Sequence, residues 1–169
     1  MPRTRSCWPL ALCFLFLLAF PSRSGAVSLS AGDEAPGFSL EDLDGNVQTL
    51  GQFRDRTVVI AFWSTWCSRC EEELLFLKEQ FGNRKDVAVL LVNQDSEKKV
   101  DRSMIRGVRD RLGIGFPILI DNGLSLWDHY GINALPTSVV IGRDGKIRYI
   151  EANFYWASPE RILAAVGPE

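Results

Sequence analysis

Two cysteines stand shortly after a long apolar run, and this arrangement constrains the fold more than any other feature of the sequence. The run is Thr57–Trp63, and its valine, isoleucine and phenylalanine content is typical of a buried strand. Cys67 and Cys70 follow, and apolar residues then recur at the spacing of one helical face: Cys70, Leu74, Leu77 and Phe81. The pattern predicts a strand over residues 57–63, a helix over 68–81, and a dithiol on the turn between them.

The first 26 residues have the composition of an export signal. Arg3 and Arg5 precede an apolar run of about thirteen residues, and small residues surround Ala26. A membrane span needs roughly twenty apolar residues, so cleavage after Ala26 is favoured, with an uncleaved membrane anchor as the alternative. We therefore expect a signal peptide over residues 1–26 and one domain over residues 27–169, outside the cytoplasm.

Loss of the signal would leave only one cysteine pair. Cys7 and Cys13 lie in the signal, so the exported domain would keep Cys67 and Cys70 out of four cysteines. A disulfide that closes so short a loop restricts the unfolded chain very little. We therefore interpret this pair as reactive rather than structural.

The charge of the domain argues against two classes of partner. Three of the 19 basic residues fall in the signal, which leaves 16 against 21 acidic residues. A net negative surface offers no electrostatic attraction for nucleic acid or for an anionic membrane.

Downstream of the dithiol, strands and helices alternate. We expect strands over 47–50, 86–93, 116–121, 137–141 and 146–150, and helices over 97–112, 124–130 and 159–166. Ser96 is the expected cap of the second helix, with an apolar face of Val100, Met104, Val108 and Leu112. Its basic face is interpreted as solvated, with a docking patch as the alternative. This order predicts an α/β protein with a mixed sheet and helices on both faces.

A dithiol at a strand-to-helix turn has a chemical rationale. The free backbone N–H groups and the dipole of the helix N-terminus stabilise a thiolate on Cys67. Cys70, one turn further along, can then attack a mixed disulfide formed on Cys67. The spacing therefore indicates a nucleophile, Cys67, and a resolving thiol, Cys70.

Other uses of two cysteines are weaker. A zinc site needs a second pair of ligands, and His129 is the only histidine. A copper carrier with Cys67, Cys70 and His129 would resemble the Sco family, which spaces its cysteines by three residues. A purely structural bridge is the third alternative.

Longer motifs resemble the TlpA/ResA type of thiol-disulfide oxidoreductases. The similar segments are Phe62–Cys70, which contains Trp66, the N-terminal Ala31–Phe38, Tyr130–Thr137, and the turn Asp144–Ile147. The resemblance covers about residues 31–166. It implies a thioredoxin fold, with a central mixed sheet flanked by helices, an N-terminal hairpin extension and an extra helix.

The resemblance also implies roles for individual residues. Pro136 is expected to follow a cis peptide bond and to face the dithiol, which is a specific prediction because cis bonds are rare even before proline. The backbone of Leu135 would then bind an extended substrate chain. Trp66 and Thr137 are the other expected substrate contacts.

Glu73 matches the active-site glutamate of that family. A carboxylate one turn after Cys70 can raise a thiol pKa and move a proton. Thioredoxin itself has a buried aspartate where this chain has Ala61, which strengthens the assignment to Glu73. For Glu71 and Glu72 we prefer a simple interaction with the helix dipole.

Two departures from the family bear on redox direction. Arg69 replaces the common proline before the second cysteine, and Leu75 replaces a proline after the glutamate. Arg69 should lower the pKa of Cys67 and make its disulfide more oxidising, whereas the acidic cluster acts in the opposite sense. The sequence therefore leaves reductase and oxidase open.

Peroxiredoxins have a similar N-terminal segment, but they require Pro seven and Thr or Ser three residues before the reactive cysteine. Here those residues are Ile60 and Ser64, so only one of the two matches. A peroxidase is therefore disfavoured.

The combined expectation is an exported protein-disulfide reductase that uses no metal or organic cofactor. Its expected partners are protein thiol or disulfide substrates and a membrane thiol protein that supplies electrons. The resemblance suggests cytochrome c maturation as the process. The oxidant of the same fold and the copper carrier are the alternatives.

Overall fold

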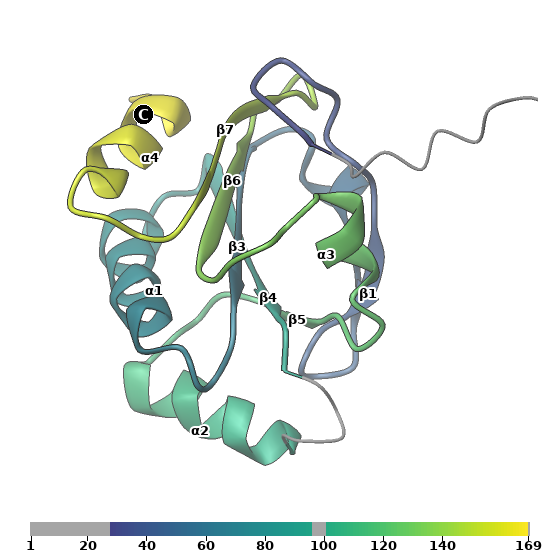
Figure 1. The fold of residues 1–169 in the computed structure, drawn as a ribbon, viewed down its shortest axis with the longest axis vertical. Coiled ribbons are helices and arrows are strands. Elements are labelled where there is room, and N and C mark those ends of the chain that lie inside the picture. The colour runs from purple at the N-terminus through teal and green to yellow at the C-terminus, as the bar shows by residue number, and fades with distance from the viewer. Residues whose placement is uncertain (1–27, 96–100, 169) are drawn as a thin grey trace, which may run out of the picture.

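A five-stranded sheet forms the centre of the protein in the computed structural model, which describes residues 28–95 and 101–168 (Figure 1). The expected signal peptide and the expected cap Ser96 lie outside these residues. The sheet has the order β5-β4-β3-β6-β7. Its strands are β3 (Thr57–Trp63), β4 (Val87–Asn93), β5 (Ile118–Ile120), β6 (Thr137–Ile141) and β7 (Ile147–Ala152).

The central strand β3 is buried along its whole length. It pairs in parallel with β4 and antiparallel with β6, which makes the sheet mixed. Successive side chains of a strand point to opposite faces. Val59, Ala61 and Trp63 accordingly join one core cluster, and the intervening residues join the other. Two apolar faces explain why the sequence of this strand is a continuous apolar run.

Helices cover both faces of the sheet, as predicted (Figure 1). One face packs against α1 (Ser68–Phe81), α2 (Arg102–Leu112) and α4 (Ser158–Val166). The opposite face packs against α3 (Ser125–His129) and the short 3-10 helix η1 (Leu50–Phe53). The bounds of β3 and α1 agree with the predicted ones.

The expected N-terminal hairpin consists of β1 (Ser39–Glu41) and β2 (Val47–Thr49). The buried carboxylate of Asp42 holds its turn, because it accepts hydrogen bonds from the backbone N–H groups of Asp44 and Asn46. Gly45 has φ +88°, a conformation that favours glycine. The prediction of a hairpin here is confirmed.

The predicted start of the second helix is wrong, and so is one residue of its predicted apolar face, Met104. The backbone of Asp101 is extended, and its side chain caps α2 by accepting a hydrogen bond from the Ser103 N–H. The buried face comprises Ile105, Val108 and Leu112, whereas Met104 is 55% exposed. Val108 and Leu112 are buried as predicted, and Val100 lies outside the described residues.

Smaller differences occur at the ends of other elements. Strand β5 is shorter than predicted, and it begins directly after Pro117, which has no amide hydrogen to donate. Helix α3 is shorter because Leu124 has φ +53° and lies outside the helix. Strand β7 continues to Ala152, beyond the predicted end at residue 150.

The basic face of α2 contacts the rest of the fold. Arg106 donates to the Leu43 carbonyl, and Arg111 forms two hydrogen bonds with the Glu71 carboxylate at 2.6 and 2.9 Å. Arg102 and Arg109 form ion pairs with Glu41 and Asp44 of the N-terminal hairpin region. These partly exposed pairs are individually weak. The described arginines of α2 therefore remain partly or largely exposed while they pair with neighbouring elements.

Within residues 28–95 and 101–168, no helix is both long enough and apolar enough to span a membrane.

Replacement of a core residue of α1 should destabilise the protein strongly. Leu77 is fully buried in the cluster between α1 and the sheet, so Leu77→Ala should lower the free energy of unfolding by about 2–5 kcal/mol. The measurement is urea denaturation at equilibrium. Leu75→Ala on the same helix, at a position 45% exposed, should change it by less than about 0.5 kcal/mol. Equal losses in the two variants would contradict this packing.

Candidate active site

The dithiol lies at the predicted junction between β3 and α1. Cys67 is the N-cap residue of α1, and its sulfur accepts a hydrogen bond from the Cys70 N–H at 3.2 Å. The two cysteines form a disulfide, with their Cα atoms 5.3 Å apart. Cys67 is half-buried, whereas Cys70 is completely buried. Only the sulfur of Cys67 is therefore open to another protein.

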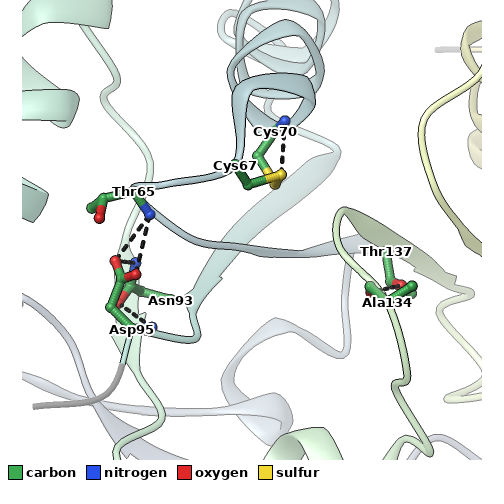
Figure 2. The surroundings of a disulfide bond; sticks show 7 residues. All are labelled: Thr65, Cys67, Cys70, Asn93, Asp95, Ala134 and Thr137. Carbon is green, nitrogen blue, oxygen red and sulfur yellow. Dashed lines mark hydrogen bonds between the residues drawn. A yellow bond between two sulfur atoms is a disulfide. The ribbon is translucent and has the colours of Figure 1, made fainter. Parts of the chain in front are cut away.

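A buried carboxylate holds the turn that carries Cys67. Asp95 accepts hydrogen bonds from the backbone N–H of Thr65 and from the Asn93 side-chain amide, as Figure 2 shows. Asp95 follows β4, whose last residue, Asn93, is paired with Trp63 of β3. The parallel pairing thus brings the ends of β3 and β4 together beside the dithiol.

The loop before β6 contains the predicted cis peptide bond, between Leu135 and Pro136. The Thr137 hydroxyl donates to the Ala134 carbonyl at 2.8 Å and closes this loop. Thr137 pairs with Phe62 of β3, and Figure 2 places Ala134 and Thr137 in the surroundings of the disulfide. The pairing of β3 with β6 therefore brings the loop to the dithiol end of the sheet.

An apolar pocket of about 250 Å³ joins two of the predicted substrate-binding residues. Trp66, which is 72% exposed, and Leu135 line it together. The remaining lining residues are Gln94, Leu124, Trp127, Asn133 and Ala134. Thr137 does not line the pocket, because it is buried and its hydroxyl is used within the loop.

Glu73 is buried beneath α1. Only 1% of the residue is exposed, and burial raises the pKa of its carboxyl group from the ordinary 4.5 to about 7. The Ser138 hydroxyl of β6 donates a hydrogen bond to Oε1, which opposes part of this rise. Oε2 has no hydrogen-bond partner among the described residues. Glu73 is thus distinct from the solvated Glu72 on the same helix.

Not every acidic residue near Cys67 contributes a full negative charge to its surroundings. Glu71 is paired with Arg111, and this hydrogen bond holds the pKa of the Glu71 carboxyl below its ordinary value. Arg69 is exposed. The charge of Glu71 is therefore largely offset, which weakens its opposition to the positive charge of Arg69.

Comparison with known proteins shows the family of the chain. A model of the AhpC/TSA family matches residues 31–150. The thiol-disulfide oxidoreductase ResA of Halalkalibacterium halodurans is 36% identical over 119 residues, which are 69% of this chain. The chain spans 65% of the length of that relative. The ResA of Geobacillus thermodenitrificans is 34% identical over 125 residues, which are 73% of this chain and 70% of that relative. The chain belongs to the AhpC/TSA family, among the ResA-type thiol-disulfide oxidoreductases.

Solved structures agree with the ResA-type assignment and confirm the thioredoxin fold. A protein described as the thiol:disulfide interchange protein DsbE from Chlorobium tepidum superposes with a TM-score of 0.73 at 27% identity, over 83% of this chain and 100% of that one. The exposed lipoprotein thioredoxin Etrx1 of Streptococcus pneumoniae superposes with a TM-score of 0.66 at 25% identity, over 78% and 98%.

Within residues 28–95 and 101–168 of this ResA-type chain, no three histidine, cysteine or acidic residues are grouped so that they could hold a metal ion. His129 is the last, exposed residue of α3.

The sequence interpretation missed Asp95 and Ser138. Asp95 lies two residues after the end of β4. Polar residues at the carboxyl ends of neighbouring parallel strands are a usable signal of proximity. Ser138 sits within an apolar strand, opposite Ala61. A single hydroxyl group in such a strand is a weaker sign of a functional role, because its partner, Glu73, lies 65 residues earlier in the chain.

Glu73 should make the stability of the ResA-type fold depend on pH. Because its pKa is raised from 4.5 to about 7, the folded state binds more protons than the unfolded state between these values. Stability should fall as pH rises through this window, by on the order of 3 kcal/mol. Glu73→Gln should remove most of this dependence in denaturation curves recorded from pH 4 to pH 8.

The exposed neighbour serves as the control for this experiment. Glu72→Gln should leave the pH dependence as it is in the natural chain. An unchanged slope in Glu73→Gln would show that this carboxyl ionises no differently in the folded and unfolded chains.

Proposed function

We propose that this chain is an exported reductase of protein disulfides. The observation that carries the proposal is the unequal exposure of the two bonded sulfurs, with Cys67 half-buried at the helix N-terminus and Cys70 fully buried. A nucleophile needs access to its substrate, whereas a resolving thiol needs access only to the nucleophile. This arrangement supports Cys67 as the attacking and Cys70 as the resolving thiol.

The reaction would proceed by two exchanges. The Cys67 thiolate attacks one sulfur of a substrate disulfide, releases the other sulfur as a thiolate, and forms a mixed disulfide. Deprotonated Cys70 then attacks the Cys67 sulfur and releases the second substrate thiolate. Two electrons pass to the substrate, and the Cys67–Cys70 disulfide remains. No cofactor other than this dithiol is proposed.

Glu73 would accept the proton that Cys70 loses. The two residues are three positions apart on α1 and therefore lie on the same side of the helix. A carboxyl group with a pKa of about 7 is divided between its two protonation states at neutral pH. Such a group can both take and return a proton there.

The loop containing Pro136 and the pocket beside it would bind the substrate. The backbone at Leu135 is proposed to pair with an extended substrate chain, and Trp66 to contact a side chain near the substrate disulfide. The 72% exposure of Trp66 supports this role, because a large exposed aromatic residue is typical of a binding surface. Thr137 would act by holding the loop closed.

The proposed setting is outside the cytoplasm. The composition of residues 1–26 supports export, and the similar Streptococcus pneumoniae protein is described as an exposed lipoprotein. A membrane thiol protein would return two electrons to the Cys67–Cys70 disulfide after each cycle. Cytochrome c maturation is the process in which we propose that its substrates take part.

The reduction potential of the Cys67–Cys70 couple tests the direction of electron flow. A reductase should have a potential close to that of thioredoxin, about −270 mV, whereas a strong oxidant lies near −120 mV. The potential is measured by equilibration with glutathione or dithiothreitol buffers. A value near the second figure would overturn the reductase assignment. Arg69→Pro should make the potential more negative, because it removes a positive charge next to Cys67.

Substitution of the resolving thiol should trap the substrate. In Cys70→Ala the mixed disulfide on Cys67 has no internal thiol to resolve it, so covalent adducts should accumulate in cells. They are detected on non-reducing gels and identified by mass spectrometry. Cys67→Ala should give no adduct of this kind, and His129→Ala should exchange disulfides at the natural rate. Failure of Cys70→Ala to form any adduct would argue against this mechanism.

A further inference from the structure

The hydroxyl group of Ser138 contacts Glu73 and takes no part in the two exchange steps. Ser138 of β6 lies opposite Ala61 of β3 and opposite Glu151 of β7 in the sheet register. Of these three sheet residues, Ser138 alone is hydrogen-bonded to Glu73. Ala61 has no polar group to offer, so Ser138 supplies the hydrogen bond of Glu73 from the sheet.

The hydroxyl of Ser138 is as inaccessible as the carboxyl group that it contacts. Ser138 is 3% exposed and Glu73 is 1% exposed. A buried carboxyl group without a hydrogen bond is destabilised by its lost hydration, and the ionised form is destabilised far more than the neutral form. With Oε2 unpartnered among the described residues, the protonation of Glu73 depends strongly on this contact.

A hydroxyl group suits a carboxyl group that changes its protonation state. It can donate its hydrogen to a carboxylate, and after rotation it can accept the hydrogen of a carboxylic acid. A lysine or arginine could only donate and would hold the carboxyl ionised. An alanine could do neither and would favour the neutral acid.

We propose that Ser138 is a positioning residue that keeps Glu73 hydrogen-bonded in both protonation states during disulfide exchange. The inference rests on the proposed role of Glu73 as the proton acceptor for Cys70. Ser138 is proposed to act through Glu73, to which it is hydrogen-bonded, and not on the substrate directly. It acts by fixing the position of the Glu73 carboxyl group and by stabilising the carboxylate form, so that this form is populated near neutral pH.

The neighbouring ionisable groups have partners of their own and interact little with Glu73. On β7, Glu151 binds Arg161 of α4 at 2.5 Å and also contacts the hydroxyl groups of Tyr149 and Ser158. Burial raises the pKa of Tyr149, so this residue stays neutral. On α1, Cys70 is bonded to Cys67 in the oxidised protein and does not titrate. A titration of the oxidised protein therefore reports on Glu73 with little interference.

The test compares two substitutions of equal size. Ser138→Thr keeps the hydroxyl group, whereas Ser138→Val replaces it with a methyl group, and both branched residues suit a strand. The pKa of Glu73 is measured in the oxidised full chain by carbon-13 NMR, with Glu73→Gln identifying the resonance. Ser138→Val should shift the titration upward, with an ionisation constant about tenfold smaller, and Ser138→Thr should restore the natural midpoint.

The same variants are then compared in the pH profile of disulfide exchange. The midpoint of the pH profile of the exchange rate should rise in Ser138→Val and should have its natural value in Ser138→Thr. In a chain that already carries Glu73→Gln, Ser138→Val should leave the profile unchanged. Ser138→Ala replaces the valine variant if the larger side chain prevents folding. A purely structural role for Ser138 would change stability and leave both midpoints in place.

Two failures can be told apart. A Glu73 titration that is the same with and without the hydroxyl group would overturn the assignment of Ser138. If Ser138→Val shifts the pKa of Glu73 but Glu73→Gln leaves the exchange rate unchanged, the proposed proton transfer by Glu73 would be overturned instead.

Discussion

The burial of β3 on both faces is the constraint on which the rest of this structure depends. A strand in the middle of a sheet, covered by helices on each side, places its last residue at a fixed point of the fold. The chain leaves that point as the short turn that carries Cys67. Its two neighbours end or begin beside it, β4 with Asn93 and β6 with Thr137. The parallel and antiparallel pairings of one strand thus assemble the dithiol, the supporting Asp95 and the cis-proline loop.

The same packing explains the two chemical environments at the dithiol. The helix N-terminus lies at the surface, so Cys67 meets solvent and the free backbone N–H groups together. One turn later the helix has entered the core, and Cys70 is enclosed among apolar residues. Glu73 lies a further turn along and shares that enclosure, which is why its carboxyl group is protonated more readily than that of an exposed glutamate. The polar chemistry proposed here therefore relies on ordinary core packing.

Local sequence patterns were sufficient to predict most elements of the fold and the placement of the dithiol. The continuous apolar run of β3 and the leucine spacing of α1 reflect burial directly, so their bounds could be predicted. Met104 was predicted to lie on the buried face of α2, but the adjacent Ile105 is buried instead. Both residues are apolar, and spacings of three and of four residues both fit the face that carries Val108, so the sequence pattern does not separate them. The pairs Glu71–Arg111 and Glu73–Ser138 join residues far apart in the chain. No local pattern encodes such contacts, since they depend on how two elements are packed.

The unequal exposure of the two cysteines limits how this protein can meet its partners. Any protein that exchanges disulfides with it must reach the sulfur of Cys67, because Cys70 is closed off by the core. An electron donor and an electron acceptor would therefore need the same small area of surface beside Trp66, and they would exclude each other. In the proposed reaction the molecule would carry two electrons from one partner to the next, and it would leave the first partner before it binds the second. Its rate of turnover would then depend on how quickly each partner is released.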